Sequence, residues 1–124
     1  MKAGDTFLRP ARSTHNEKQH LWIVITDPNT ENKVLIVNIT SLKSWQDQTV
    51  ILNRGEHPFI TEPSCVFYRE AEIVDNSKLD QAESMGAIAK RECCSESVIN
   101  LIRSGVVASP QTRRVIKKFF SDFK

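Results

Sequence analysis

Histidines supply the most direct chemical signal in this chain of 124 residues. His57 lies in the segment GEHPFI, between the apolar stretches TVIL and CVFY. Because imidazole groups titrate near neutral pH, His57 could accept or donate a proton during a reaction. The proline that follows biases its backbone towards an extended shape, which would fix the ring on the rim of a loop. The same pattern also fits a turn histidine without a chemical task.

Phosphate binding is the second chemistry that the residue types suggest. His20 begins an apolar run. A protonated ring there could stabilise phosphate charge, and a strand residue facing solvent is the alternative. Thr40 and Ser41 end a second apolar run, where their hydroxyls and N–H groups could hold a phosphate oxygen or cap a turn. The cations that could contact the same phosphate include Arg9, Lys18 and Lys43.

Trp45 follows the Thr-Ser step within a polar stretch. An exposed tryptophan there would offer a stacking surface for an unpaired base, whereas a buried one would anchor the loop against the sheet. The histidines and cysteines show no spacing typical of a metal site, and the glycines do not form a phosphate-binding loop. The sequence therefore predicts chemistry without a metal or another cofactor.

The cysteines and the net charge restrict the class of protein. The adjacent pair Cys93-Cys94 suits neither an ordinary disulfide nor a metal knuckle, so we expect a reducing, cytoplasmic compartment. The first ten residues lack the apolar core of a signal peptide, and no run is long enough to cross a membrane. A formal net charge of +2 does not by itself indicate a nucleic-acid partner.

The first two thirds of the chain predict a sheet. The runs HLWIVITD and KVLIVNIT are rich in β-branched residues, which favours two strands buried on both faces, with Trp22 in the core. The turn PNTENK between them is too short for a crossover helix, so the pair should be antiparallel. Shorter strands are expected at residues 6–8, 49–52, 65–68 and 71–74.

The last third of the chain changes to a helical period. Ser95 is a plausible N-cap for a helix that Gly105 would end. Ser109-Pro110 predicts the start of another helix, and residues 78–94 are ambiguous. The chain should thus be one α+β domain, residues 1–124. We expect a small antiparallel barrel over about residues 3–75, with helices over about residues 95–124 against one side.

Three stretches of this outline resemble, in order, the PemK/MazF plasmid-maintenance toxins. AGDTFL resembles the Gly-Asp opening strand of that family. HLWIVITDP followed by VLIVNITS resembles its paired strands, the second of which ends in Thr-Ser. SCVFYREAEIVDNSKL resembles its late strand, a short polar step and a Val-Asp that leads to a leucine.

The resemblance implies an SH3-like barrel and a metal-independent endoribonuclease that acts on single-stranded RNA by attack of the ribose 2′-hydroxyl on the adjacent phosphate. It also implies an antitoxin protein partner and a homodimer. The catalytic residues would then be His57, His20 and Arg9, and the substrate contacts would be Thr40, Ser41, Lys18, Lys43 and Trp45. Where the family usually has Arg-Pro, this chain has His20-Leu21. That difference favours the alternative, a non-catalytic SH3-like module for a protein or nucleic-acid partner.

Overall fold

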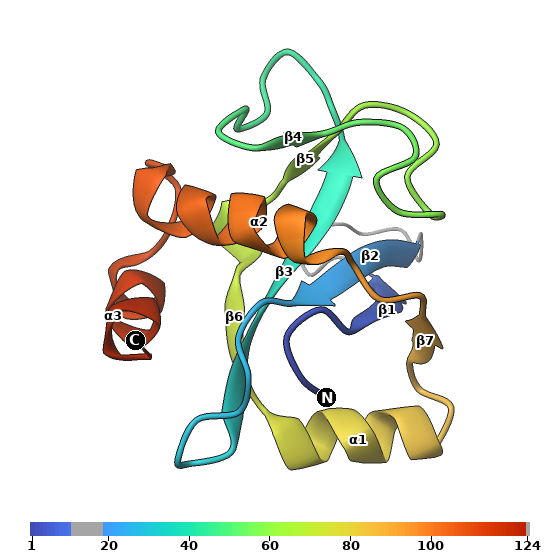
Figure 1. The fold of residues 1–124 in the computed structure, drawn as a ribbon, viewed down its shortest axis with the longest axis vertical. Coiled ribbons are helices and arrows are strands. Elements are labelled where there is room, and N and C mark those ends of the chain that lie inside the picture. The colour runs from blue at the N-terminus through green and yellow to red at the C-terminus, as the bar shows by residue number, and fades with distance from the viewer. Residues whose placement is uncertain (11–18, 124) are drawn as a thin grey trace.

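A computed structural model describes residues 1–10 and 19–123 of the chain. The described residues form one antiparallel sheet and three α-helices, which confirms the α+β class (Figure 1). The strands are β1 (Thr6–Pro10), β2 (Gln19–Val24), β3 (Lys33–Ser41), β4 (Ile51–Leu52), β5 (Ser64–Val66), β6 (Glu72–Asp75) and β7 (Ala89–Arg91). The helices are the 3₁₀ helix η1 (Tyr68–Glu70), α1 (Asn76–Ser84), α2 (Glu96–Ala108) and α3 (Arg114–Asp122).

Strand β3 is the centre of the sheet. One of its edges pairs with β2, which confirms the predicted antiparallel hairpin. Its other edge pairs with β6 along its first half and with β5 along its second half. The strand order is β4-β5-β3-β2-β1-β7, and no pairing joins β4 to β7 among the described residues. The sheet is therefore open, and the closed SH3-like barrel implied by the resemblance is not shown.

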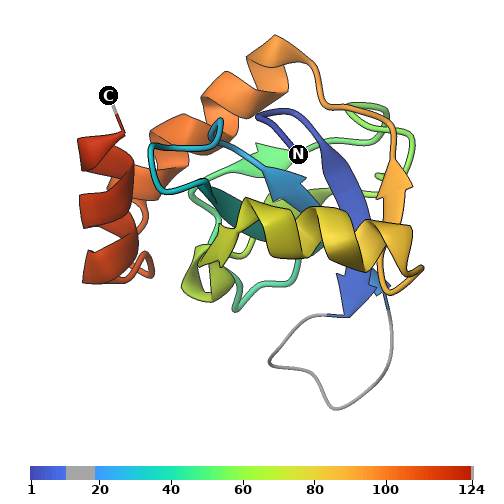
Figure 2. The same cartoon turned by 90° about the horizontal axis from the view of Figure 1, so that it is seen from below.

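The central strands are buried on both faces, as their continuous apolar runs predict. Because successive side chains of a strand point to opposite faces, β2 and β3 supply two separate apolar clusters. Leu21, Ile23 and Val37 pack with residues of α2 and α3. Trp22 and Val24 pack with residues of β1, β3 and α1. Figures 1 and 2 show α2 lying across the strands and α1 lying apart from it, so the helices do not all cover one side.

The helical part differs from its prediction at two positions. Ser95 does cap α2, since its side chain accepts a hydrogen bond from the N–H of Val98. Gly105 does not end that helix, which continues to Ala108. Ser109 is the C-cap of α2 and does not start α3, whose N-cap is Arg113.

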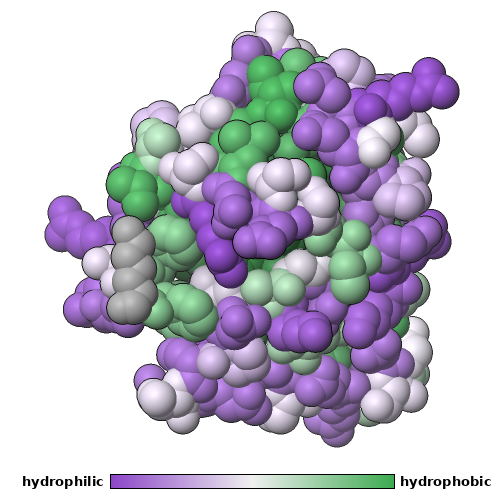
Figure 3. All heavy atoms as spheres, in the orientation of Figure 1, coloured by the Kyte–Doolittle hydropathy of each residue, from purple (hydrophilic) through white to green (hydrophobic). Residues whose placement is uncertain are grey.

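Within the described ranges, no helix is both long enough and apolar enough to span a membrane. The face in Figure 3 is mostly polar in its lower half, near α1.

Glycine is required at position 105 because α2 passes too close to Tyr68 and Val50 to leave room for a side chain. A Cβ atom at this position would lie 2.0 Å from Oη of Tyr68 and 2.7 Å from Cγ2 of Val50. The Tyr68 hydroxyl is itself fixed, since it donates a 2.7 Å hydrogen bond to the carbonyl of Ile102 in the same helix. Tyr68 therefore binds α2 through this hydrogen bond and, at Gly105, sets how closely the helix can approach the sheet.

Gly105→Ala should lower the thermal midpoint even though alanine is the better helix former. The gain in helix propensity is about 1 kcal/mol, and overpacking a well-filled core costs about 1–3 kcal/mol. The 2.0 Å approach to Tyr68 places the cost in the upper part of this range, about 2–3 kcal/mol, so we expect a net loss of about 1–2 kcal/mol in the free energy of unfolding, measured by urea denaturation. Ser104→Ala, one residue earlier on the exposed side, is the control and should change that free energy by less than about 0.5 kcal/mol. An equally stable Gly105→Ala variant would show that α2 can move away from Tyr68.

Asp47 connects the loop between β3 and β4 to the end of α2. Its Oδ2 accepts a very short hydrogen bond from the hydroxyl of Ser109, and its Oδ1 accepts from the hydroxyl and the N–H of Thr49. Burial alone would raise the pKa of Asp47, but the hydrogen bonds from Ser109 and Thr49 lower it below its ordinary value. The charged carboxylate is therefore the form that holds the loop on the helix.

Asp47→Asn should destabilise the chain at pH 7 by about 1 kcal/mol, because the amide is a weaker acceptor than the carboxylate. The lowered pKa means that this stabilisation is present above about pH 4 and is lost as the pH falls through the folded-state value. The difference between the two proteins in urea denaturation should thus shrink as the pH falls below about 4. Asp122→Asn, which removes only an exposed pair with Lys118, is the control. A difference that stays constant with pH would contradict the assignment.

Candidate functional site

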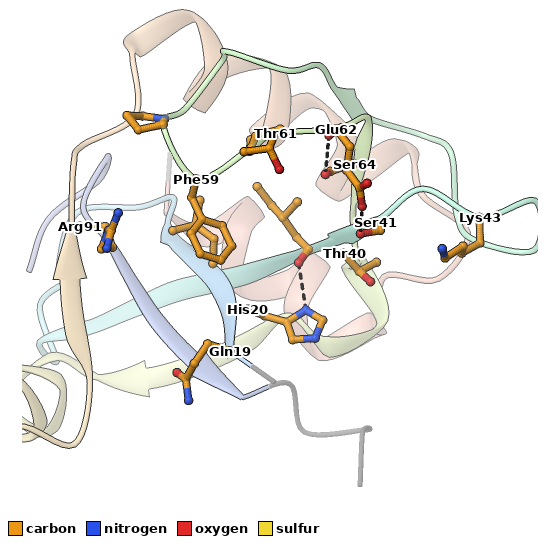
Figure 4. A pocket seen from close by; sticks show the side chains of 14 residues that line it. Gln19, His20, Thr40, Ser41, Lys43, Phe59, Thr61, Glu62, Ser64 and Arg91 are labelled. Carbon is orange, nitrogen blue, oxygen red and sulfur yellow. Dashed lines mark hydrogen bonds between the residues drawn. The ribbon is translucent and has the colours of Figure 1, made fainter. Parts of the chain in front are cut away.

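A groove of about 590 Å³ lies where β2 begins and β3 ends, beneath the connection from β4 to β5 (Figure 4). Four of the predicted site residues line it together: His20, Thr40, Ser41 and Lys43. They come from two neighbouring strands and the turn after β3, so the antiparallel hairpin is what gathers them. The far wall is formed by residues 58–62 and by Arg91 of β7. The groove therefore brings together four of the eight residues that the sequence predicts for the site.

His20 is oriented by the backbone of the neighbouring strand. Its Nδ1 lies 3.0 Å from the carbonyl oxygen of Ile39, and a carbonyl can only accept, so Nδ1 carries the hydrogen. Among the described residues, no group is hydrogen-bonded to its Nε2. His20 is half-buried and lines the groove, and Figure 4 shows its ring against the end of β3. A neutral His20 therefore offers a fixed proton acceptor, which is the geometry of an oriented general base.

Ser41 is not a free hydroxyl. It donates a 2.5 Å hydrogen bond to Oε1 of Glu62, on the opposite wall. The carbonyl of Glu62 accepts in turn from the hydroxyl of Ser64. This pair closes one end of the groove and places an acidic acceptor there. Lys43 is exposed at the same end.

Phe59, Glu62 and Arg91 are groove residues that sequence reasoning did not identify. Phe59 lies within the GEHPFI segment, two residues after the histidine that was predicted to be catalytic. Arg91 falls in the ambiguous stretch after residue 78, and no local pattern separates it from the other surface cations. Only the antiparallel pairing of β7 with β1 brings it to the groove. Its guanidinium has one weak charged neighbour, Glu92 Oε1 at 3.4 Å.

His57 lies behind the groove wall rather than in the groove. Its side chain is 1% exposed, although the next two residues are exposed. Nε2 lies 2.6 Å from the carbonyl oxygen of Glu92, and Nδ1 accepts a 3.0 Å hydrogen bond from the N–H of Phe59. Both ring nitrogens are thus engaged with the backbone. The catalytic role predicted for His57 stays a prediction, and its surroundings are those of a structural histidine.

Arg9 is also held by structural contacts. It is the cross-strand partner of His20 in the β1–β2 register. Its guanidinium lies 4.0 Å from the centre of the Trp22 ring and forms a 2.8 Å ion pair with Glu72. Cation–π stacking and a half-buried ion pair together fix the cation on the sheet. Arg9 does not line the groove, so it does not join His20 there.

The two remaining predicted contacts have different outcomes. Lys18 lies outside the residues that the structure describes. Trp45 is 76% exposed in the connection between β3 and β4, so the alternative of a buried loop anchor is wrong. It does not line the groove, and its stacking role stays a prediction.

The cysteines add no reactive group to the site. Burial raises the pKa of both Cys65 and Cys94 to about 11. Cys93 is exposed, but its hydrogen bond to Asp5 raises its pKa as well. All three thiols are therefore protonated at neutral pH and poorly nucleophilic. The described residues contain no group of three or more His, Cys, Asp or Glu side chains placed to hold a metal ion.

No protein-family model, no curated protein and no solved structure matches this chain.

Proposed function

We propose that this chain binds single-stranded RNA in the groove and cleaves it without a metal, with His20 as the group that moves the proton. The observation that carries the proposal is the orientation of His20, which lines the groove with its Nδ1–H held by the Ile39 carbonyl, while no described group is hydrogen-bonded to Nε2. A half-buried imidazole with one nitrogen fixed and the other available is suited to general base catalysis at neutral pH. Cations at both ends of the groove, Lys43 and Arg91, suit an anionic strand.

The reaction requires few groups. Nε2 of His20 takes the proton of a ribose 2′-hydroxyl, and the resulting oxygen attacks the adjacent phosphorus. The bond from phosphorus to the 5′ oxygen of the next nucleotide breaks, and that oxygen takes a proton from water. The hydroxide that remains takes the proton held by His20, which returns the ring to its starting form. The products are a 2′,3′-cyclic phosphate and a 5′-hydroxyl. Arg91 would stabilise the extra negative charge of the phosphorane, for which a guanidinium is well suited.

The resemblance to the PemK/MazF toxins supports the same activity and adds partners. Under this proposal the chain is a cytoplasmic toxin, an antitoxin protein neutralises it, and two copies associate through the sheet. The SH3-like barrel belongs to the proposal as well. Its support is that β3 shares one edge between β5 and β6, as a bent strand in a small barrel would. Expression of the chain alone should then arrest growth.

A second function, a non-catalytic groove for single-stranded nucleic acid, is favoured by a different observation. Two of the three predicted catalytic residues are held in structural contacts, His57 by the backbone and Arg9 by Trp22 and Glu72. Only His20 of the three lines the groove. A binding module needs the same cations and aromatic surface but no general base.

The test is His20→Asn, assayed with single-stranded RNA in the presence of a chelator. Asparagine can still donate to the Ile39 carbonyl, but it lacks the basic Nε2. The cleavage rate should fall about 10²- to 10⁴-fold, the usual contribution of a general base, while the dissociation constant for RNA changes little. Gln19→Ala, which alters the adjacent exposed lining residue, is the control and should keep most of the activity.

The outcomes separate the two functions. If the parent protein binds single-stranded RNA but cleaves none, the endoribonuclease proposal is wrong and the non-catalytic binding function is supported. Cleavage at the parent rate by His20→Asn would remove His20 from the mechanism. A parent protein that neither binds nor cleaves single-stranded RNA would remove both functions.

A further inference from the structure

The buried ring of His57 connects the two segments that form the far wall of the groove. Its Nδ1 accepts from the N–H of Phe59 at 3.0 Å, and its Nε2 donates to the carbonyl of Glu92 at 2.6 Å. Glu92 directly follows Arg91, which lines the groove together with Phe59. One side chain that is 1% exposed therefore sets the backbone positions of an aromatic residue and a cation that lie more than thirty residues apart in the sequence.

The hydrogen-bond partners determine which nitrogen carries the hydrogen. An amide N–H can only donate and a carbonyl can only accept, so the ring has its hydrogen on Nε2. The Glu92 carbonyl also accepts a 2.7 Å hydrogen bond from the hydroxyl of Thr6, whose oxygen lies 3.4 Å from Nε2 of His57. Two donors thus fix this carbonyl. Removal of the ring would leave the N–H of Phe59 without this acceptor and would leave the hydroxyl of Thr6 as the one remaining donor to the Glu92 carbonyl among the described residues.

The loop that carries Phe59 is closed on itself. The N–H of Ile60 donates to the carbonyl of His57 at 2.9 Å, and the N–H of Gly55 donates to the carbonyl of Ile60 at 3.1 Å. Ile60 is buried, and Gly55 has a φ of +92°, which glycine adopts without strain. Phe59 therefore projects from a fixed turn, and the residue is 37% exposed.

The exposed parts of this wall have complementary chemistry. Figure 4 shows the Phe59 ring projecting into the groove and Arg91 on the strand beside it. The ring offers an apolar plane, and a base can stack on such a plane whatever its identity. The Arg91 side chain is 40% exposed, and its only charged partner among the described residues, Glu92 at 3.4 Å, is itself exposed. Such a pair is weak enough to be exchanged for a phosphate.

We propose that Phe59 and Arg91 form a subsite for one unpaired nucleotide, with the base on the Phe59 ring and the phosphate at Arg91. His57 is the positioning residue that fixes their spacing. The inference rests on the proposed binding of single-stranded nucleic acid in the groove. It specifies which residues read the strand and assigns the buried histidine a role in affinity rather than in proton transfer. RNA and single-stranded DNA share the base and the phosphate, so either could fill the subsite.

The first experiment measures dissociation constants by fluorescence anisotropy, with a labelled 2′-O-methyl RNA, the matching single-stranded DNA and a duplex of the same sequence. Phe59→Ala should weaken binding of the single strands about 5- to 150-fold, the range for loss of one stacked base, and Phe59→Trp should restore it. Arg91→Ala should weaken binding and lower the slope of log affinity against log salt by about 0.7. Met85→Ala and Lys90→Ala, an exposed apolar residue and a cation outside the groove, are the controls.

The second experiment separates the two hydrogen bonds of His57. His57→Asn can keep the acceptor for the Phe59 N–H, and His57→Gln can keep the donor for the Glu92 carbonyl. Each should bind single strands at least about fivefold more weakly than the parent at a temperature where circular dichroism shows both folded. The backbone amide resonance of Phe59 should move in His57→Gln and stay in His57→Asn. These variants keep the test valid even where His57→Ala does not fold.

The results distinguish this inference from the proposed function on which it depends. If the parent binds single strands and Phe59→Ala binds them equally well, the subsite is wrong while the groove remains. If the folded His57 variants bind as the parent does, the positioning role is wrong. Equal dependence on Phe59 for the duplex would also overturn the subsite, since paired bases cannot stack on the ring. Loss confined to the RNA arm supports the subsite and assigns RNA as its ligand.

Discussion

Burial of β2 and β3 on both faces is the constraint from which the rest of the structure follows. The register of a strand with one solvent-exposed face is less strongly fixed. In β2 or β3, a shift of one residue would move every side chain from one apolar cluster to the other. The register of Leu21 with Ile39 is consequently fixed at the point where the hairpin ends. His20 lies one residue beyond that last pair, and Thr40 and Ser41 lie beyond it on the other strand. The groove residues are thus positioned by packing that none of them provides.

The ends of such a sheet leave backbone groups that need partners, and two histidines serve them. At the last β2–β3 pair, Leu21 with Ile39, the Ile39 carbonyl accepts from Nδ1 of His20. Past the end of β7, the Glu92 carbonyl accepts from Nε2 of His57. The two rings therefore hold opposite tautomers, each set by a carbonyl. What differs is the second nitrogen, because that of His57 takes a backbone N–H and that of His20 lies at the groove. The proposed function therefore places proton transfer on His20, the histidine that resembles an ordinary strand residue in the sequence.

Much of the fold could be predicted because its signals are local. The apolar runs of β2 and β3, the turn between them and the Ser95 cap each depend on a few neighbouring residues. The predicted helix end at Gly105 and helix start at Ser109 were wrong because glycine and serine have several structural uses. The missing side chain of Gly105 allows α2 to approach Tyr68 closely, and the hydroxyl of Ser109 donates a hydrogen bond to Asp47. Strand β7 could not be predicted, since three exposed residues carry no periodic pattern.

The site was predictable in its residue types and not in its geometry. Thr40, Ser41 and His20 come together because they lie near the ends of paired strands, which a hairpin prediction already implies. Exposure is a property of the whole fold, so the sequence could not show that His57 is buried or that Arg91 reaches the groove from β7. Proline after His57 did indicate a fixed ring, but the ring is fixed behind the wall.

The distribution of charge along the groove limits how a strand could lie in it. The end near Ser41 carries the Glu62 carboxylate, whose Oε1 already accepts from Ser41. A phosphate placed against that carboxylate would be repelled, and the exposed Lys43 nearby offsets the repulsion only partly. At the other end Arg91 provides a guanidinium fork beside the Phe59 ring. Glu62 is instead suited to accept hydrogen bonds from hydroxyl or amino groups. A strand with its phosphate near Arg91 would therefore place sugar or base donors near Glu62, and His20, which lines the same groove, would be available to a ribose hydroxyl.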